Sequence, residues 1–133
     1  MDEIKIKPIG IIHTPFENDG EAPFQGREAP ESIGRLEIFP EFAEGLDGVE
    51  KFEYLTVVFY FHLRGKAKLK VIPRKGNELR GVFSTRAPSR PNHIGITVVR
   101  LISVDGNILT VSGVDMLDGT PLLDIKPTIE CCK

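Results

Sequence analysis

Hydrophobic and polar residues alternate along several short runs that glycine and proline separate, which is the pattern of half-buried β-strands. The strongest run, YLTVVFYF at residues 54–61, is apolar on both faces and predicts a central strand. No segment keeps a helical period over ten residues, so only one or two helical turns are expected, at 40–46. Further strands are predicted at 4–12, 34–39, 66–72, 80–84, 96–104, 108–114 and 122–125.

Seven or eight short strands with glycine and proline turns predict an all-β fold, either an antiparallel β-barrel or a sandwich. Asp105-Gly106-Asn107 lies between two predicted strands and indicates a tight hairpin. Residues 17–32 show no periodicity and predict a long loop, and such loops in a compact domain are often functional. The 133 residues fit a single domain spanning 1–133.

Charge is distributed unevenly along the chain, although the net charge is only −2. Residues 1–63 hold thirteen acids and five bases, whereas residues 64–90 hold nine bases and one acid. Such asymmetry is typical of a patch for a polyanion, and a solvated face that keeps the protein soluble is the alternative. The candidate RNA-binding residues in this patch are Lys66, Lys68, Lys70, Arg74, Lys75, Arg80 and Arg90.

The run KAKLKVI at 66–72 alternates strictly between basic and apolar residues as far as Val71. In a strand its three lysines share one face and its apolar residues share the other. The alternation therefore predicts a lysine ridge on one face of the sheet.

Cysteine chemistry and membrane insertion are not expected. Cys131 and Cys132 are adjacent, and neighbouring cysteines rarely bridge each other. The three histidines are scattered and show no zinc spacing, so no metal is predicted. The chain has no apolar run long enough for a transmembrane helix and starts without an apolar signal core, so a cytoplasmic location and no membrane partner are expected.

Two segments combine charge with backbone constraint. STRAPSRPNHIG at 84–95 places two fixed cations among two prolines and an amide, which is typical of a loop that holds donors against an anionic or planar ligand. An ordinary connecting loop is the alternative. DMLDGTPLLDIKP at 115–127 holds three carboxylates around Gly119. Together the two loops can clamp a ligand that carries a carboxylate with hydroxyl or ammonium groups.

The motifs together resemble the TsaA-like proteins, the TrmO family of tRNA methyltransferases. In chain order they are GIIHTPF at 10–16, APFQGR at 22–27, GVFSTRAPSRPNHIG at 81–95 and DMLDGTPLLDIKP at 115–127. The resemblance implies an antiparallel β-barrel that binds S-adenosylmethionine without a Rossmann fold, as a homodimer with the cofactor near the subunit interface. It also implies methyl transfer to N6 of threonylcarbamoyladenosine beside the tRNA anticodon. A non-catalytic nucleic-acid-binding barrel and a small-molecule methyltransferase remain alternatives.

The chemistry of individual residues is compatible with that cofactor. Arg86 can pair with the cofactor carboxylate in a charge-assisted bond, and Asp115 or Asp118 can hold the ribose or the amino group. Because an exocyclic amine is a poor nucleophile, a carbonyl that accepts its N–H assists it, and Asn92 or Asp115 is the candidate. The implied cofactor contacts are Phe24, Gln25, Gly26, His62, Leu63, Arg86, Ile96, Asp115, Met116, Leu117, Asp118 and Gly119.

The chain departs from the family pattern in two places. The family motif usually reads RPNPIG, and His93 stands here where the second proline is expected. We expect this substitution to loosen the loop and to place a titratable group near the site. After DIKP the chain continues as TIECCK, without the aromatic residue and proline that are usual there, and without the C-terminal domain that bacterial members often add.

Overall fold

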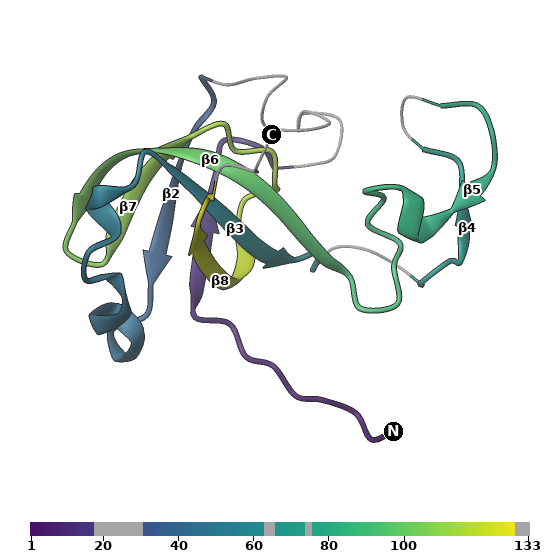
Figure 1. Cartoon of the computed structure of the whole chain (residues 1–133), viewed down its shortest axis with the longest axis horizontal. Helices are drawn as coiled ribbons and strands as arrows, with labels where there is room; N and C mark the ends of the chain where they lie inside the picture. The colour runs from purple at the N-terminus through teal and green to yellow at the C-terminus, as the bar shows by residue number, and fades with distance from the viewer. Residues whose placement is uncertain (18–30, 63–65, 74–75, 130–133) are drawn as a thin grey trace.

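Six strands close into an antiparallel β-barrel in the order β1–β2–β7–β6–β3–β8 (Figure 1). The computed structural model describes residues 1–17, 31–62, 66–73 and 76–129. The predicted all-β barrel with short helical turns is confirmed. The barrel strands are β1 (Gly10–His13), β2 (Ile33–Ile38), β3 (Tyr54–Tyr60), β6 (Ile94–Asp105), β7 (Ile108–Ser112) and β8 (Thr120–Pro127).

A small second sheet lies outside the barrel and consists of β4 (Lys70–Val71) and β5 (Arg80–Gly81). We call residues 66–93, which carry this sheet, the arm. Figure 1 shows the arm standing apart from the barrel, beyond the end of β3 and the start of β6. The described residues also form the 3-10 helices η2 (Pro40–Leu46), η3 (Val49–Lys51) and η4 (Val82–Ser84). None of the helices in the described part of the chain is long and apolar enough to cross a membrane.

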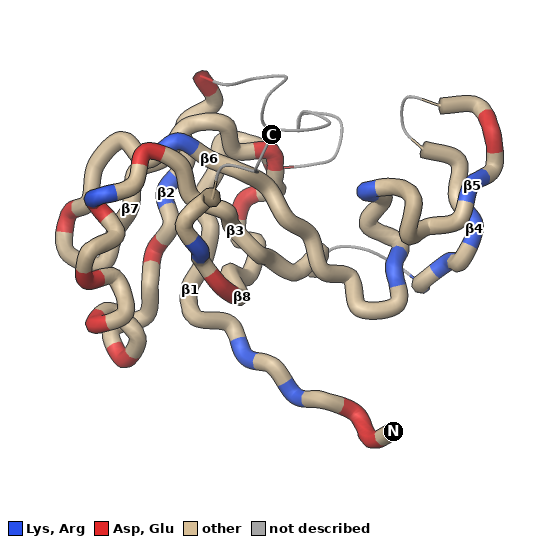
Figure 2. Tube along the Cα trace, in the orientation of Figure 1, with Lys and Arg blue, Asp and Glu red and all other residues tan. Residues whose placement is uncertain are grey.

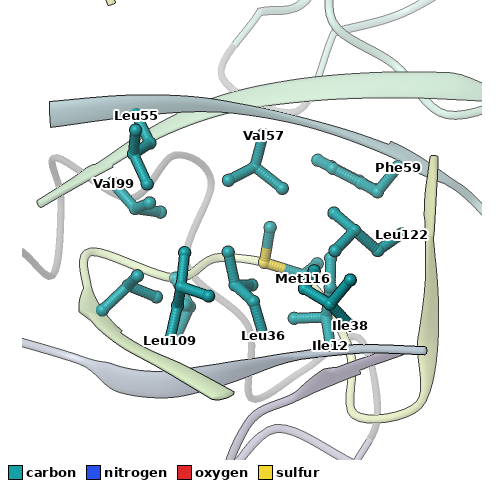
Figure 3. Packing of buried hydrophobic residues seen from close by; sticks show 12 residues of the cluster. Ile12, Leu36, Ile38, Leu55, Val57, Phe59, Val99, Leu109, Met116 and Leu122 are labelled. Atoms are coloured by element: carbon teal, nitrogen blue, oxygen red, sulfur yellow. The ribbon is translucent and has the colours of Figure 1, made fainter. Parts of the chain in front are cut away.

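The core fills the barrel with aliphatic side chains from every strand. Leu55, Val57 and Phe59 point inward from β3 and are at most 4% exposed. Figure 3 shows them facing side chains of β1 and β2, with Met116 between the two layers. Because these residues alternate along their strands, burial of one face fixes the register of the barrel.

The first strand is shorter than the sequence predicts. The pattern indicates a strand over 4–12, but β1 begins at Gly10, and Ile4 and Ile6 are exposed. Pro8 lacks a donor for a sheet ladder, which limits how far pairing extends toward the N-terminus. Gly10 is needed where pairing begins, because a Cβ there would lie 2.1 Å from the carbonyl oxygen of Glu37.

The strand predictions within the arm also need correction. Of the predicted strand at 66–72 only Lys70–Val71 is strand, and of that at 80–84 only Arg80–Gly81. The chain turns into η4 directly after β5, so the partner strand that would extend β4 is missing. Val71 is buried as predicted, but Leu69 is exposed together with the lysines. The alternation of basic and apolar residues at 66–71 therefore does not produce a strand with one buried and one exposed face.

The predicted hairpin and the closing strand are confirmed. Asp105 ends β6 and Ile108 begins β7, and Gly106 has φ +61° in the two-residue turn between them. A glycine at positive φ in the first turn position suits the twist of a β-hairpin. The predicted segment 122–125 lies in β8, which pairs with both β1 and β3 and so closes the barrel.

Candidate functional site

The acidic turn, residues 113–119, connects β7 to β8 and is bonded to the chain that follows β1. The backbone N–H of Thr14 donates to Asp118 Oδ1 at 2.9 Å, and the Asp118 N–H donates to the carbonyl of Phe16 at 2.7 Å. The Thr14 hydroxyl donates to the carbonyl of Met116 at 2.9 Å. These bonds hold the turn rigidly against the GIIHTPF segment, which explains why two distant motifs belong to one site.

Asp118 lies beside a histidine at the end of β1. His13 Nδ1 is 4.0 Å from Asp118 Oδ1, and His13 Nε2 is 2.8 Å from Glu37 Oε1 of β2. The Asp118 side chain is 46% exposed, and an ionised carboxylate has about four acceptor positions. The carboxylate therefore keeps the capacity to accept hydrogen bonds from a ligand while Thr14 holds its orientation.

Asp115 is positioned by a threonine that points into the barrel. Thr97 of β6 is 6% exposed, and its hydroxyl donates to Asp115 Oδ2 at 3.1 Å. Asp115 itself is half-buried. The same turn sends the side chain of Met116 into the core, at 4% exposure, so its predicted cofactor contact would involve its backbone. Leu117 is half-buried, and Gly119 has φ +83°.

Arg86, from the cationic loop at 84–95, also contacts β6. Its side chain is exposed, and Nη1 donates to the carbonyl of Ile96 at 3.2 Å. Ile96 directly precedes Thr97, so the cationic loop and the acidic turn meet β6 at adjacent residues. Among the described residues, β7 pairs with β6 only from Arg100 onward, so no described strand covers that edge of β6 at residues 94–99. The arrangement brings a fixed cation and a carboxylate to one stretch of strand.

Arg90 organises its own loop. Its Nη1 donates to the carbonyls of Thr85 at 2.8 Å and Ala87 at 3.2 Å, and its guanidinium lies 6.0 Å from the Phe83 ring centroid. Asn92 is exposed at the end of the same loop. An RNA contact by Arg90 and a catalytic role for Asn92 stay predictions.

His93 adopts a backbone conformation that proline cannot reach. Its φ is +50°, whereas a proline ring fixes φ near −65°. His93 Nδ1 lies 3.1 Å from the carbonyl of Pro88, and the His93 carbonyl accepts from the N–H of Phe61 at 2.8 Å. The ring also packs edge-on against Tyr60. His93 therefore contacts Pro88 within its own loop and ties the end of that loop to Phe61 after β3. The looser loop expected from the loss of the proline stays a prediction.

A glycine is needed at position 95 because of close packing, and not because the backbone adopts a positive φ. Its φ is not positive, but a Cβ at this position would lie 2.6 Å from two ring atoms of Phe59. Phe59 and Phe61 meet there edge-to-face with ring centroids 5.2 Å apart. The absence of a side chain at Gly95 thus makes room for the rings of Phe59 and Phe61 beside the first residues of β6.

His62 follows β3 and is half-buried. Burial lowers the pKa of its imidazole below the ordinary value of about 6.5, so the ring is neutral at physiological pH. A neutral imidazole does not repel a cationic ligand. Phe24, Gln25, Gly26, Leu63, Arg74 and Lys75 were predicted as site residues and lie outside the described residues.

The sequence interpretation missed three residues that build the site. His13 and Thr14 bind the acidic turn, and both lie in the GIIHTPF motif, which contributes to the family resemblance but to which no site role is assigned from the sequence. Thr97 had a usable signal, because it stands at an inward position between Gly95 and Val99 where an apolar residue is expected. A polar residue in such a position needs a partner inside the protein.

Comparisons with known proteins agree with this architecture. The family model of the tRNA-methyltransferase O N-terminal domain matches residues 11–132 of this chain. A Pyrococcus abyssi protein, called a probable S-adenosyl-L-methionine-binding protein, is 52% identical over 92% of this chain and 67% of its own length. The crystal structure of TrmO from Pseudomonas aeruginosa superposes with a TM-score of 0.80 at 38% identity, over 96% of this chain and 57% of that one.

A mouse tRNA (adenine(37)-N6)-methyltransferase is 41% identical over 92% of this chain and 30% of its own length. This chain therefore belongs to the tRNA-methyltransferase O family, which confirms the resemblance that its motifs carry. It spans little more than half of the solved relative and under a third of the mouse protein.

Proposed function

We propose that this chain is an S-adenosylmethionine-dependent methyltransferase that modifies N6 of an adenosine in tRNA, with threonylcarbamoyladenosine beside the anticodon as its substrate. Family membership supports the class of enzyme, and the name of the mouse relative supports a tRNA adenosine as the acceptor. The observation that carries the proposal is the meeting of Arg86 and Asp115 at adjacent residues of β6.

The chemistry of the site fits the cofactor. S-adenosylmethionine carries a carboxylate, an ammonium group and two ribose hydroxyls, and when bound it supplies the methyl group. Arg86 gives one N–H to Ile96 and keeps others for a charge-assisted pair with the carboxylate. Asp118, half-exposed and fixed by Thr14, is suited to accept from a ribose hydroxyl. Leu117 offers half-buried apolar surface for the adenine.

The chain's contribution to methyl transfer is chiefly positioning. An in-line displacement needs the acceptor nitrogen close to the methyl carbon and aligned with the bond that breaks. Asn92 or Asp115 accepts the N–H of the amine and so orients its lone pair. Thr97 holds Asp115 in place for this purpose. Exclusion of water from the site when substrate and cofactor are bound would strengthen each of these polar contacts.

RNA recognition is assigned to the arm. Lys66, Lys68, Lys70 and Arg80 are all exposed, and Figure 2 shows lysine and arginine gathered on the arm while most acids lie on the barrel. Lysine side chains on a projecting element are suited to contact phosphates without reading sequence. We also propose that the protein acts as a homodimer in the cytoplasm.

Mass spectrometry of tRNA nucleosides tests the proposal directly. tRNA that contains threonylcarbamoyladenosine is incubated with the protein and methyl-labelled S-adenosylmethionine, and unmodified tRNA serves as the control. The proposal predicts one added methyl group on threonylcarbamoyladenosine. Cofactor binding without RNA methylation would favour a small-molecule methyltransferase, and RNA binding without cofactor binding would favour a non-catalytic barrel.

A further inference from the structure

His13 lies at the end of β1 between two carboxylates. It follows the buried Ile12, so its side chain points out of the barrel. Its Nε2 is 2.8 Å from Glu37 Oε1 of β2, and its Nδ1 is 4.0 Å from Asp118 Oδ1 of the acidic turn. The three side chains are between 38% and 46% exposed, so a ligand can reach all of them.

The contact with Glu37 fixes which nitrogen of His13 carries the proton. An ionised carboxylate only accepts hydrogen bonds, so Nε2 is the donor in the 2.8 Å contact. In the neutral imidazole, Nδ1 then keeps a lone pair and is an acceptor. Its separation of 4.0 Å from Asp118 Oδ1 is too long for a hydrogen bond, which agrees with two acceptors that face each other. Glu37 thus presents an acceptor nitrogen beside the Asp118 carboxylate.

The donors that hold Asp118 in place are used within the protein. The Thr14 N–H donates to Asp118 Oδ1, and the Thr14 hydroxyl donates to the carbonyl of Met116. The Asp118 N–H donates to the carbonyl of Phe16. The pair formed by His13 Nδ1 and the Asp118 carboxylate therefore offers acceptors to a ligand, and a group that binds both brings two hydrogen-bond donors.

The ribose of S-adenosylmethionine carries such a pair of donors, because its 2′ and 3′ hydroxyls stand on adjacent carbon atoms. The ammonium group of the cofactor also has several donors, but it shares a carbon atom with the carboxylate. Pairing of the carboxylate with Arg86 brings the ammonium group toward Asp115, since Arg86 and Asp115 contact adjacent residues of β6. His13 and Asp118 are then left for the ribose.

We propose that His13 and Asp118 together bind the ribose diol of S-adenosylmethionine, and that Glu37 positions His13 for this contact. One hydroxyl donates to His13 Nδ1 and the other to the Asp118 carboxylate. The inference rests on the cofactor of the proposed function and adds a specificity determinant to it. A deoxyribose leaves one of the two acceptors unpaired, so the site selects a ribonucleoside cofactor. The alternative is that His13 and Glu37 form only a cross-strand pair that stabilises β1 against β2.

The test combines three ligands with variants of His13. The ligands are S-adenosylhomocysteine, which has the same ribose, and its 2′-deoxy and 3′-deoxy analogues. His13→Leu removes both ring nitrogens. His13→Asn is too short to keep the bond to Glu37, but it carries an amide oxygen, which can accept, at the branch where Nδ1 stands. Arg35→Gln, opposite His13 in the register of β1 and β2, is the matched control.

Calorimetry is expected to show that the wild type and Arg35→Gln bind each deoxy analogue roughly 5- to 30-fold more weakly than the parent ligand. His13→Leu should lose a similar factor in affinity for the parent. It should also no longer distinguish the parent from one of the two analogues, because that hydroxyl has lost its partner. His13→Asn should keep the discrimination. Glu37→Ala should weaken the same contact when His13 is present and have no effect on His13→Asn.

A wild type that binds both analogues as tightly as the parent would overturn the inference, as would a His13→Leu variant that discriminates like the wild type. His13→Asn behaving like His13→Leu would also overturn it, because loss of the bond to Glu37 would then explain the effect. An equal effect of Glu37→Ala in both backgrounds would overturn the positioning role of Glu37. Circular dichroism verifies that each variant is folded. Failure of the wild type to bind the parent would overturn the proposed function as well, whereas binding without hydroxyl discrimination would overturn this inference alone.

Discussion

Arg86 and Asp115 contact neighbouring residues of β6, although they belong to loops of opposite charge. The guanidinium of Arg86 donates to the carbonyl of Ile96 at 3.2 Å, and the hydroxyl of Thr97 donates to Asp115 at 3.1 Å. The strand therefore sets the separation between the cation and the carboxylate. A ligand with opposite charges at its two ends meets a preorganised pair of partners, which reduces the ordering cost of binding.

Thr97 gives the first prediction, because its hydroxyl is almost fully buried and holds Asp115. Thr97→Val removes the donor and keeps the shape of the side chain. We expect the free energy of unfolding to fall by about 1–3 kcal/mol, since a half-buried carboxylate loses a hydrogen bond. Affinity for S-adenosylmethionine should fall as well. Urea denaturation and calorimetry measure the two effects. Thr97→Ser keeps the hydroxyl and is the control; equal binding by both variants would show that this bond does not position Asp115.

His93 gives a prediction about the departure from the family motif. Restoring the usual proline, His93→Pro, should destabilise the protein by more than about 1 kcal/mol, because proline cannot adopt φ +50°. His93→Gly keeps that conformation accessible and loses only the imidazole contacts, so its cost should be smaller. Urea denaturation compares the two variants. A proline variant as stable as the glycine variant would contradict the backbone conformation described for this loop.

The pH dependence of stability tests the burial of His62. Its folded pKa is lower than the value of about 6.5 in the unfolded chain. As the pH falls through about 6.5, the unfolded chain takes up the proton first, so stability is lost toward acid and is fully present at higher pH. His62→Gln should therefore flatten the dependence of unfolding free energy on pH between about pH 7 and pH 5. Identical curves of unfolding free energy against pH for wild type and variant would show that the His62 imidazole is exposed to solvent and not buried.

The lysines of the arm give a prediction about RNA. Replacing Lys66, Lys68 and Lys70 together with glutamine should weaken tRNA binding and lower the slope of log affinity against log salt by about 0.7–0.9 per lost phosphate contact. Lys51→Gln, a change on the acidic side of the barrel, is the control. Filter binding at several salt concentrations measures both quantities. An unchanged slope in the triple variant would assign the phosphate contacts to other lysine or arginine residues.

The barrel was predictable because its strands carry their own signals. β3 is apolar on both faces and pairs along its length with both β6 and β8, and Gly106 marks the hairpin that follows β6. The arm was not predictable in the same way. Its alternating lysines indicate a long strand, but strand length depends on a partner, and the chain enters η4 at Val82 instead of continuing β5.

The site was predictable by motif and not by geometry. The sequence identifies Arg86, Asp115 and Asp118 as charged residues in constrained loops. It does not show that Thr97 and Thr14 hold the carboxylates, because those bonds join residues 18 and 104 positions apart. The role of Gly95 likewise depends on Phe59 and Phe61, which cross it only in the folded barrel.

Calorimetric titration of S-adenosylmethionine into the wild type and Arg86→Ala tests the central claim most directly. The account predicts that the folded wild type binds one cofactor per chain. It predicts that Arg86→Ala weakens binding by about 1.5–3 kcal/mol, because a charge-assisted pair with the cofactor carboxylate is lost. Absence of binding heat at several temperatures, or equal affinity in a folded Arg86→Ala variant, would contradict the assignment of this site to the cofactor.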